Sequence, residues 1–191
     1  QVFTDGPDRD RDFIFRADMR KDRFILWTIS EREPNDWGGR LEVETKPYEP
    51  QLEVGQALGF RVRANPTVAI SRDGKRGKRH DVVMHAKYQL SPEEREDLDM
   101  RALIREKGRE WLEGKAAREG FSLEGHPLSV EGYQQHEFKK HPGSRHTVQF
   151  STLDFEGILE VTDLERFRAL LYRGLGPAKA YGNGLMLIRP V

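Results

Sequence analysis

The sequence predicts an α+β protein made of two tandem ferredoxin-like (RRM-like) domains, the first lacking its opening strand and helix. Its later residues predict helix, strands, helix, glycine-rich loop and strand, and its earlier residues predict strand, strand, loop and strand. Adding an opening strand and helix gives each half the β-α-β-β-α-β order of that fold. A length of 191 residues suits two such units. We expect an incomplete N-terminal domain over 1–88 and a C-terminal domain over 89–191.

The first half contains three segments with strand patterns. Residues 12–19 and 23–30 are rich in aromatic and β-branched residues and flank a short turn. Residues 31–51 contain several prolines and glycines, which predicts a loop. Residues 58–63 alternate apolar and basic side chains, which predicts a strand with one basic face. Pro66 disfavours helical backbone at the residue before it, so this strand ends there.

The second half follows a run of five bases within 72–79, which has no apolar period and predicts an exposed loop. A proline at the first helical position and acids in the first turn then predict a long helix over 91–119. Residues 121–161 predict mostly strands, including a hairpin with a basic tip. A second helix ends at Gly174, and residues 185–191 predict a buried closing strand.

Composition places few limits on function. Lys plus Arg equals Asp plus Glu at 32 each, so no net charge favours nucleic acid, although the charges are segregated along the chain. There is no cysteine, and the six histidines show no zinc-type pairing on a helix, so neither a metal nor a cofactor is expected. No apolar run is long enough for a membrane span, and no secretory signal is visible. A cytoplasmic protein without a membrane partner is therefore expected.

The stretch Gly174–Gly184, GLGPAKAYGNG, contains four glycines and one lysine. It follows a helix and precedes a strand, the reverse of the order that a dinucleotide fingerprint needs. It also lacks the Gly-Lys-Ser/Thr of a P-loop. The backbone could still bind phosphate through a nest of N–H groups. The alternative is a helix cap followed by a turn, and the residues themselves favour that alternative by about two to one.

Motifs along the chain resemble those of the CasE family, the CRISPR repeat-processing endoribonucleases of the type I-E Cascade complex. Residues 155–191 resemble the family's C-terminal F-x-G-x-L-x-V strand, short helix and G-x-G-x-x-K-x-x-G-x-G-L-L loop. Residues 60–66 resemble its F-R-L-R-A-N-P segment, and residues 11–18 its early R-D-F-L-F strand. These matches occur in the family's order, which makes the resemblance more specific than a glycine motif alone.

The resemblance implies a tandem ferredoxin-like fold that binds the stem-loop of a CRISPR repeat. It implies metal-independent cleavage of one phosphodiester at the 3′ base of the stem, with the RNA's own 2′-hydroxyl as the attacking group. The product end would be a 2′,3′-cyclic phosphate or its opened form. The enzyme would then stay on the guide RNA as a subunit beside the other Cascade subunits.

The sequence departs from the family at its start. The family places a catalytic histidine and a nearby tyrosine in a first helix, upstream of the R-D-F strand. The ten residues before that strand here, QVFTDGPDRD, contain neither type. We expect both residues, with the opening strand and helix, upstream of Gln1, so the catalytic residues remain unknown. A noncatalytic RNA-binding scaffold subunit of the same fold is the alternative. A nucleotide-binding metabolic enzyme is disfavoured by the motif order.

The candidate RNA contacts are basic side chains and loop positions. The family inserts basic hairpin residues into the major groove of the stem, and we expect the glycine loop here to hold RNA through close approach of its backbone. A single basic residue of this kind is as consistent with a solvated charged turn. The expected RNA-binding residues are Lys139, Lys140 and Arg145 at the hairpin tip; Lys75, Arg76, Lys78 and Arg79 in the basic run; Arg61 and Arg63 on the strand; and Gly174, Gly176, Lys179, Gly182 and Gly184 in the loop.

Overall fold

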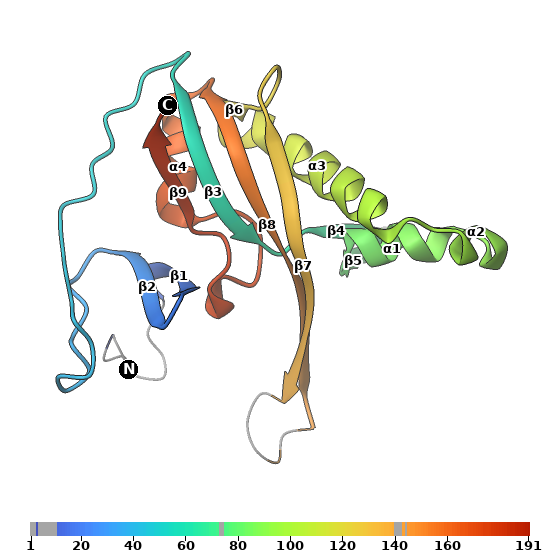
Figure 1. Ribbon diagram of the computed structural model, residues 1–191, viewed down its shortest axis with the longest axis horizontal. Helices are drawn as coiled ribbons and strands as arrows, with labels where there is room; N and C mark the ends of the chain where they lie inside the picture. The colour runs from blue at the N-terminus through green and yellow to red at the C-terminus, as the bar shows by residue number, and fades with distance from the viewer. Residues whose placement is uncertain (1–2, 4–10, 73–74, 140–142, 144) are drawn as a thin grey trace.

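The computed structural model describes residues 3, 11–72, 75–139, 143 and 145–191. It is a mixed α+β fold with one large antiparallel sheet and two smaller hairpins. Figure 1 shows the sheet with its two longest helices behind it and one hairpin reaching well beyond the rest of the molecule. In the part of the chain that the structure describes, no helix is long and apolar enough to cross a membrane.

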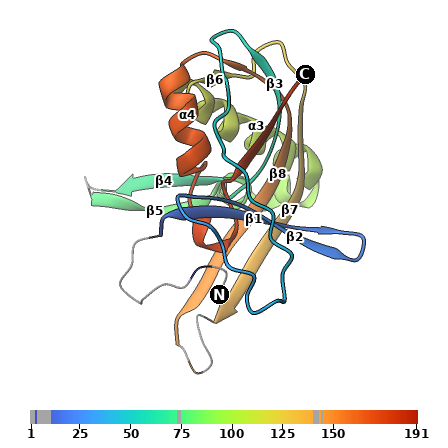
Figure 2. The ribbon, with the colours of Figure 1, turned by 90° about the vertical axis from the view of Figure 1, so that its left-hand side faces the viewer.

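The N-terminal hairpin consists of β1 (Phe13–Arg20) and β2 (Arg23–Ser30), joined by a tight turn with Lys21 at φ 53. Its register runs from Phe13 opposite Ser30 to Arg20 opposite Arg23, which confirms both predicted strands. The next described strand begins at Ala57, so the loop predicted over 31–51 continues to residue 56. Figure 2 shows the hairpin crossing in front of β7 and β8 of the large sheet.

The large sheet has the order β6-β8-β3-β9, with β7 also paired to β8. Its strands are β3 (Ala57–Ala64), β6 (Phe121–Ser122), β7 (Leu128–Lys139), β8 (Thr147–Val161) and β9 (Met186–Pro190). The strand predicted over 58–63 was placed with the N-terminal domain. In the structure, β3 pairs with β8 on one side and with β9 on the other.

The basic run is not a loop, contrary to the sequence analysis. Residues 75–81 form β5 (Lys75–Asp81), which pairs antiparallel with β4 (Thr67–Arg72). Main-chain pairing in an exposed two-stranded hairpin does not require apolar alternation, so the pattern gave no signal. Two hydrogen bonds anchor this hairpin: Trp111 Nε1 donates to the Thr67 carbonyl at 3.2 Å, and the Tyr133 hydroxyl donates to Asp81 at 2.9 Å.

The predicted 91–119 helix is divided into two. Helix α1 (Val82–Gln89) precedes α2 (Pro92–Glu96), and α3 (Met100–Glu119) follows. The break falls at Asp99, whose carboxylate accepts hydrogen bonds from the backbone N–H groups of Arg101 and Ala102. A side chain that satisfies the first free N–H groups begins a new helix. Helix α4 (Leu164–Arg173) ends at Gly174 as predicted. Gly174 has φ 78, and its N–H donates a hydrogen bond to the Leu170 carbonyl.

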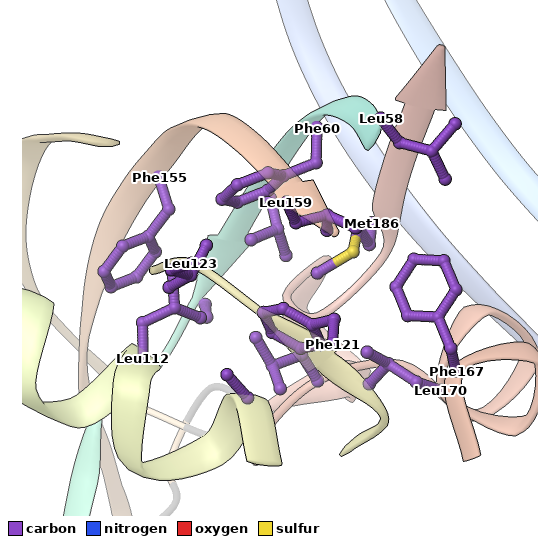
Figure 3. Packing of buried hydrophobic residues seen from close by; sticks show 14 of the residues in the cluster. Leu58, Phe60, Leu112, Phe121, Leu123, Phe155, Leu159, Phe167, Leu170 and Met186 are labelled. Atoms are coloured by element: carbon purple, nitrogen blue, oxygen red, sulfur yellow. The ribbon is translucent and has the colours of Figure 1, made fainter. Parts of the chain in front are cut away.

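The core lies between the sheet and helices α3 and α4. Trp111 of α3 stacks on Phe155 of β8 with ring centroids 5.7 Å apart. Helix α3 comes close to the sheet at Gly108, where an added Cβ would lie 3.0 Å from Leu153 Cδ1. Figure 3 shows apolar side chains of the helices, Leu112, Phe167 and Leu170, meeting those of the sheet, Phe60, Phe121, Leu159 and Met186.

Candidate nucleic-acid interface

The β7–β8 hairpin extends beyond the rest of the sheet (Figure 1), and its sequence has cations near its end. The last described pair of its ladder is Lys139 opposite Thr147. Lys139 and Arg145 are both exposed, as predicted for the basic tip. Lys140 lies outside the described residues. Two paired strands hold such cations away from the body of the protein, where they can reach a nucleic-acid groove.

The glycine-rich loop is folded closely on itself and on β3. The Leu175 N–H donates to the Gly184 carbonyl at 2.8 Å, and the Gly184 N–H donates to the Arg63 carbonyl at 2.7 Å. Gly174, Gly182 and Gly184 are buried, with φ values of 78, 78 and 94. These are cap and turn positions that only glycine adopts easily. The loop's glycines therefore maintain its shape, whether or not its backbone also contacts phosphate.

Gly184→Ala is expected to lower the free energy of unfolding by about 2–4 kcal/mol, because it adds backbone strain and a steric clash. An added Cβ would lie 2.6 Å from the Leu175 carbonyl oxygen, and φ is +94. Gly125→Ala is the matched control, since Gly125 has φ +74 with no atom within 4 Å. This control should lower the free energy of unfolding by about 1 kcal/mol, because only the positive φ opposes the substitution. Equal losses in urea unfolding would contradict the crowding at Gly184.

The glycine loop touches three other parts of the chain. A Cβ on Gly176 would meet the Trp111 ring of α3 at 3.3 Å. A Cβ on Gly182 would meet the Phe15 ring of β1 at 3.1 Å. Tyr181, in the short 3-10 helix η1 (Lys179–Tyr181), stacks on Phe150 of the long hairpin. The loop is thus the junction between the helical layer, the N-terminal hairpin and the basic hairpin.

Cations gather around this junction. Lys179 is half-buried, and burial together with the charge of Arg173 lowers its pKa. Burial is the main reason that the pKa of Lys115 is lowered, and the charges of Arg118, Arg79 and Arg173 lower it further. The Lys115 ammonium lies 5.8 Å from the centroid of the Trp111 ring. Arg173 also pairs with Glu119. A phosphate here would relieve the mutual repulsion of the cations.

Lys115 and Arg173 are not among the RNA-binding residues predicted from the sequence. Lys115 lies in the middle of α3, where nothing in the local pattern distinguishes it from other solvated lysines. Arg173 could have been suspected, because it directly precedes the loop glycine Gly174. Of the predicted basic run, Lys78 and Arg79 are exposed on β5, and the charge of Arg79 reaches Lys115. The side chains of Lys75 and Arg76 lie outside the described part of the structure.

The two strand arginines have acidic partners within the protein. Arg63 forms a bidentate ion pair with Asp154, in which the Nε–Oδ1 distance is 3.1 Å and the Nη2–Oδ2 distance is 2.8 Å. Hydrogen bonding to Asp154 raises the pKa of Arg63. Arg61 lies 3.9 Å from Glu156 in a looser, exposed pair. An RNA contact for Arg63 stays a prediction, but it would have to compete with Asp154.

The remaining surface features favour neither a metal nor a phosphate. Among the described residues, no three His, Cys, Asp or Glu side chains are grouped so that they could hold a metal ion. A hollow of about 170 Å³ lies on the sheet face next to Arg61. Three carboxylates line it, from Glu131, Asp154 and Glu156, so its charge disfavours a phosphodiester.

A comparison with protein families decides the relationship. The model of the family described as CRISPR associated protein matches residues 1–190. The chain belongs to this family. The Escherichia coli (strain K12) relative, CRISPR system Cascade subunit CasE, is 28% identical over 192 residues, covering 100% of this chain and 87% of that protein. The resemblance found in the sequence is thereby confirmed.

Two further proteins that are similar to this chain are described as endoribonucleases. The CRISPR-associated endoribonuclease Cse3 of Thermus thermophilus is 35% identical over 152 residues, covering 76% of this chain and 61% of that protein. A solved structure of CRISPR endoribonuclease Cse3 bound to 19 nt RNA matches with a TM-score of 0.67 and 28% identity. That match covers 93% of this chain and 80% of the other. The predicted α+β class agrees with that fold.

Proposed function

We propose that the protein is an endoribonuclease that binds the stem-loop of CRISPR repeat RNA and cuts the precursor into guide RNA. It then stays bound as a cytoplasmic subunit of a Cascade complex. The observation that carries this proposal is the likeness, over 93% of the chain, to Cse3 bound to RNA. The family match over residues 1–190 and the CasE relative support it.

The cations provide two kinds of contact to such an RNA. Lys139 and Arg145 project on a narrow two-stranded arm. The major groove of A-form RNA is deep and narrow, so this arm would enter at the wider end of a short stem. Lys115 and Arg173 lie beside the glycine loop and Lys179 lies within it. These three cations would follow the phosphate backbone. Both contacts are largely electrostatic and would release counterions on binding.

We infer the architecture from the order of the larger elements. From β3 to β9 that order is β3, α3, β7, β8, α4 and β9, which is the β-α-β-β-α-β order of a ferredoxin-like unit. The β1–β2 hairpin would belong to a second unit. This proposal moves the domain boundary from residue 88 to the 31–56 segment.

The decisive experiment uses protein made from its complete gene and a precursor RNA with two repeats. We expect one cut in each repeat and a product that remains bound during gel filtration. Tight binding without cutting would favour the noncatalytic scaffold instead. Failure to distinguish repeat RNA from an unrelated hairpin RNA would overturn the proposal.

Lys139→Ala and Arg145→Ala should each weaken binding of repeat RNA and flatten its salt dependence. Each phosphate contact contributes roughly one unit to the slope of log K against log salt. Arg109→Ala is the matched control, since Arg109 is an exposed cation on α3 that pairs with Glu113. Affinity measured across a salt series checks the prediction. A slope that is unchanged in both hairpin variants would make the tip an ordinary solvated turn.

A further inference from the structure

Four aromatic rings meet where the glycine loop touches the long hairpin. We call these residues the aromatic cluster: His136 and Phe138 of β7, Phe150 of β8 and Tyr181 of η1. On the hairpin, His136 lies directly opposite Phe150, and Phe138 lies opposite Val148. Because strand partners share a face, the hairpin rings lie on one side of the ladder. Tyr181 joins them there from the loop.

Phe150, His136 and Tyr181 form a short stack, and Phe138 stands roughly perpendicular to it. Phe150 is stacked with His136, at a centroid distance of 4.8 Å, and with Tyr181, at 5.0 Å. Phe138 stands at 90° to Phe150 and at 74° to Tyr181. His136 is fixed by a 3.0 Å hydrogen bond between its Nε2 and the Thr152 hydroxyl. The stack therefore has fixed positions, as a binding platform requires.

The outer rings of the cluster remain open to solvent. Tyr181 is 43% exposed and Phe138 is 41% exposed. A cluster that only held the loop against the hairpin would bury these rings more completely, because exposed aromatic surface gains nothing from packing. Lys179 lies two residues before Tyr181 in the same loop. Open aromatic faces close to a cation are suited to bases and phosphates of a single strand.

We propose that the aromatic cluster binds an unpaired nucleobase of the RNA next to the stem, stacked on Tyr181 and bordered by Phe138. This inference rests on the proposed function and adds a second class of contact to it. The basic tip holds the paired stem by charge, whereas the cluster holds single-stranded RNA by stacking. The cluster would fix where the strand leaves the stem, and so contribute to the choice of cut site.

The test compares two RNAs that carry a 2′-deoxy nucleotide at the cut site, so that both stay intact. One is the repeat stem-loop alone, and the other adds single-stranded extensions of about four nucleotides on each side. Tyr181→Leu and Phe138→Leu should each lose about 5- to 100-fold in affinity for the extended RNA. Their affinity for the bare stem-loop should stay within about twofold of the unmodified protein. Tyr181→Phe, which keeps the ring, should bind both RNAs normally.

A fluorescent base provides an independent reading of stacking. The base 2-aminopurine, placed in the extension, should be quenched on the unmodified protein and on Tyr181→Phe, but not on Tyr181→Leu. Leucine variants that bind the extended RNA normally would overturn the inference. Equal losses for both RNAs would also overturn it, because the ring would then only hold the loop in place. A protein that binds neither RNA would instead refute the proposed function.

Discussion

Asp18→Ala is expected to lower the free energy of unfolding by about 3–5 kcal/mol, the cost of leaving a buried charge without its partner. Arg16 is fully buried and its Nε lies 2.9 and 3.1 Å from the two Asp18 oxygens. Its Nη2 reaches Asp154 at a longer 3.4 Å, and its Nη1 has no hydrogen-bond partner among the described residues. Without Asp18, Arg16 would keep only that longer contact.

A surface pair provides the matched control for this prediction. Glu113 and Arg109 lie one helical turn apart on α3 at 3.4 Å, each about half exposed. Glu113→Ala should cost no more than about 0.5 kcal/mol. The double variant Arg16→Met with Asp18→Leu should recover most of the loss, because it removes both charges. Urea unfolding measures all three variants. A loss for Asp18→Ala no larger than that for Glu113→Ala would contradict the prediction.

This ion cluster illustrates what the sequence could not predict. Arg16 and Asp18 alternate correctly within a strand pattern, so the hairpin itself was predicted. Alternation says which residues share a face but not what that face will contact. Asp154 comes from the distant strand β8, and it accepts hydrogen bonds from Arg16 and from Arg63 only after the sheet has formed. The family motifs identified Arg63 as basic and strand-borne, but they did not reveal its acidic partner.

The position of β3 could not be predicted for a related reason. Its alternating pattern predicted a strand, and residues 57–64 are one. Which sheet a strand joins depends on pairing with β8 and β9, far along the chain. Sequence order alone placed it with β1 and β2. Patterns with a period of two describe one strand at a time and contain no information about its neighbours.

The candidate site was predictable where it rests on local signals. The pairing of β7 with β8 as a hairpin and the cap at Gly174 follow from proline, glycine and strand patterns within short stretches. The aromatic cluster does not, because Tyr181 reaches Phe150 only through the fold of the glycine loop. Lys115 likewise comes close to the loop through Trp111, which contacts Gly176. Such surfaces arise from tertiary packing.

Replacing the 2′-hydroxyl at the cut site with hydrogen is expected to reduce cleavage of repeat RNA below detection, while binding stays unchanged. In the mechanism that we propose, this oxygen attacks the neighbouring phosphorus in line with the leaving 5′ oxygen. The O2′–P bond forms as the P–O5′ bond breaks. A base takes the 2′ proton, and an acid gives one to the 5′ oxygen. The products are a 2′,3′-cyclic phosphate and a 5′-hydroxyl, and no nucleophile remains once the 2′-hydroxyl is removed.

The controls separate this mechanism from hydrolysis by a bound water. A 2′-deoxy nucleotide placed one position away from the cut site should leave cleavage nearly unchanged, because its oxygen takes no part in the reaction. Cleavage of unmodified RNA should survive EDTA and give a cyclic phosphate end that acid opens. A deoxy substrate that is still cut would mean that a water or hydroxide attacks instead. Activity that is lost on chelation and restored by magnesium would mean that a metal, rather than side chains, stabilises the negative charge of the phosphorane.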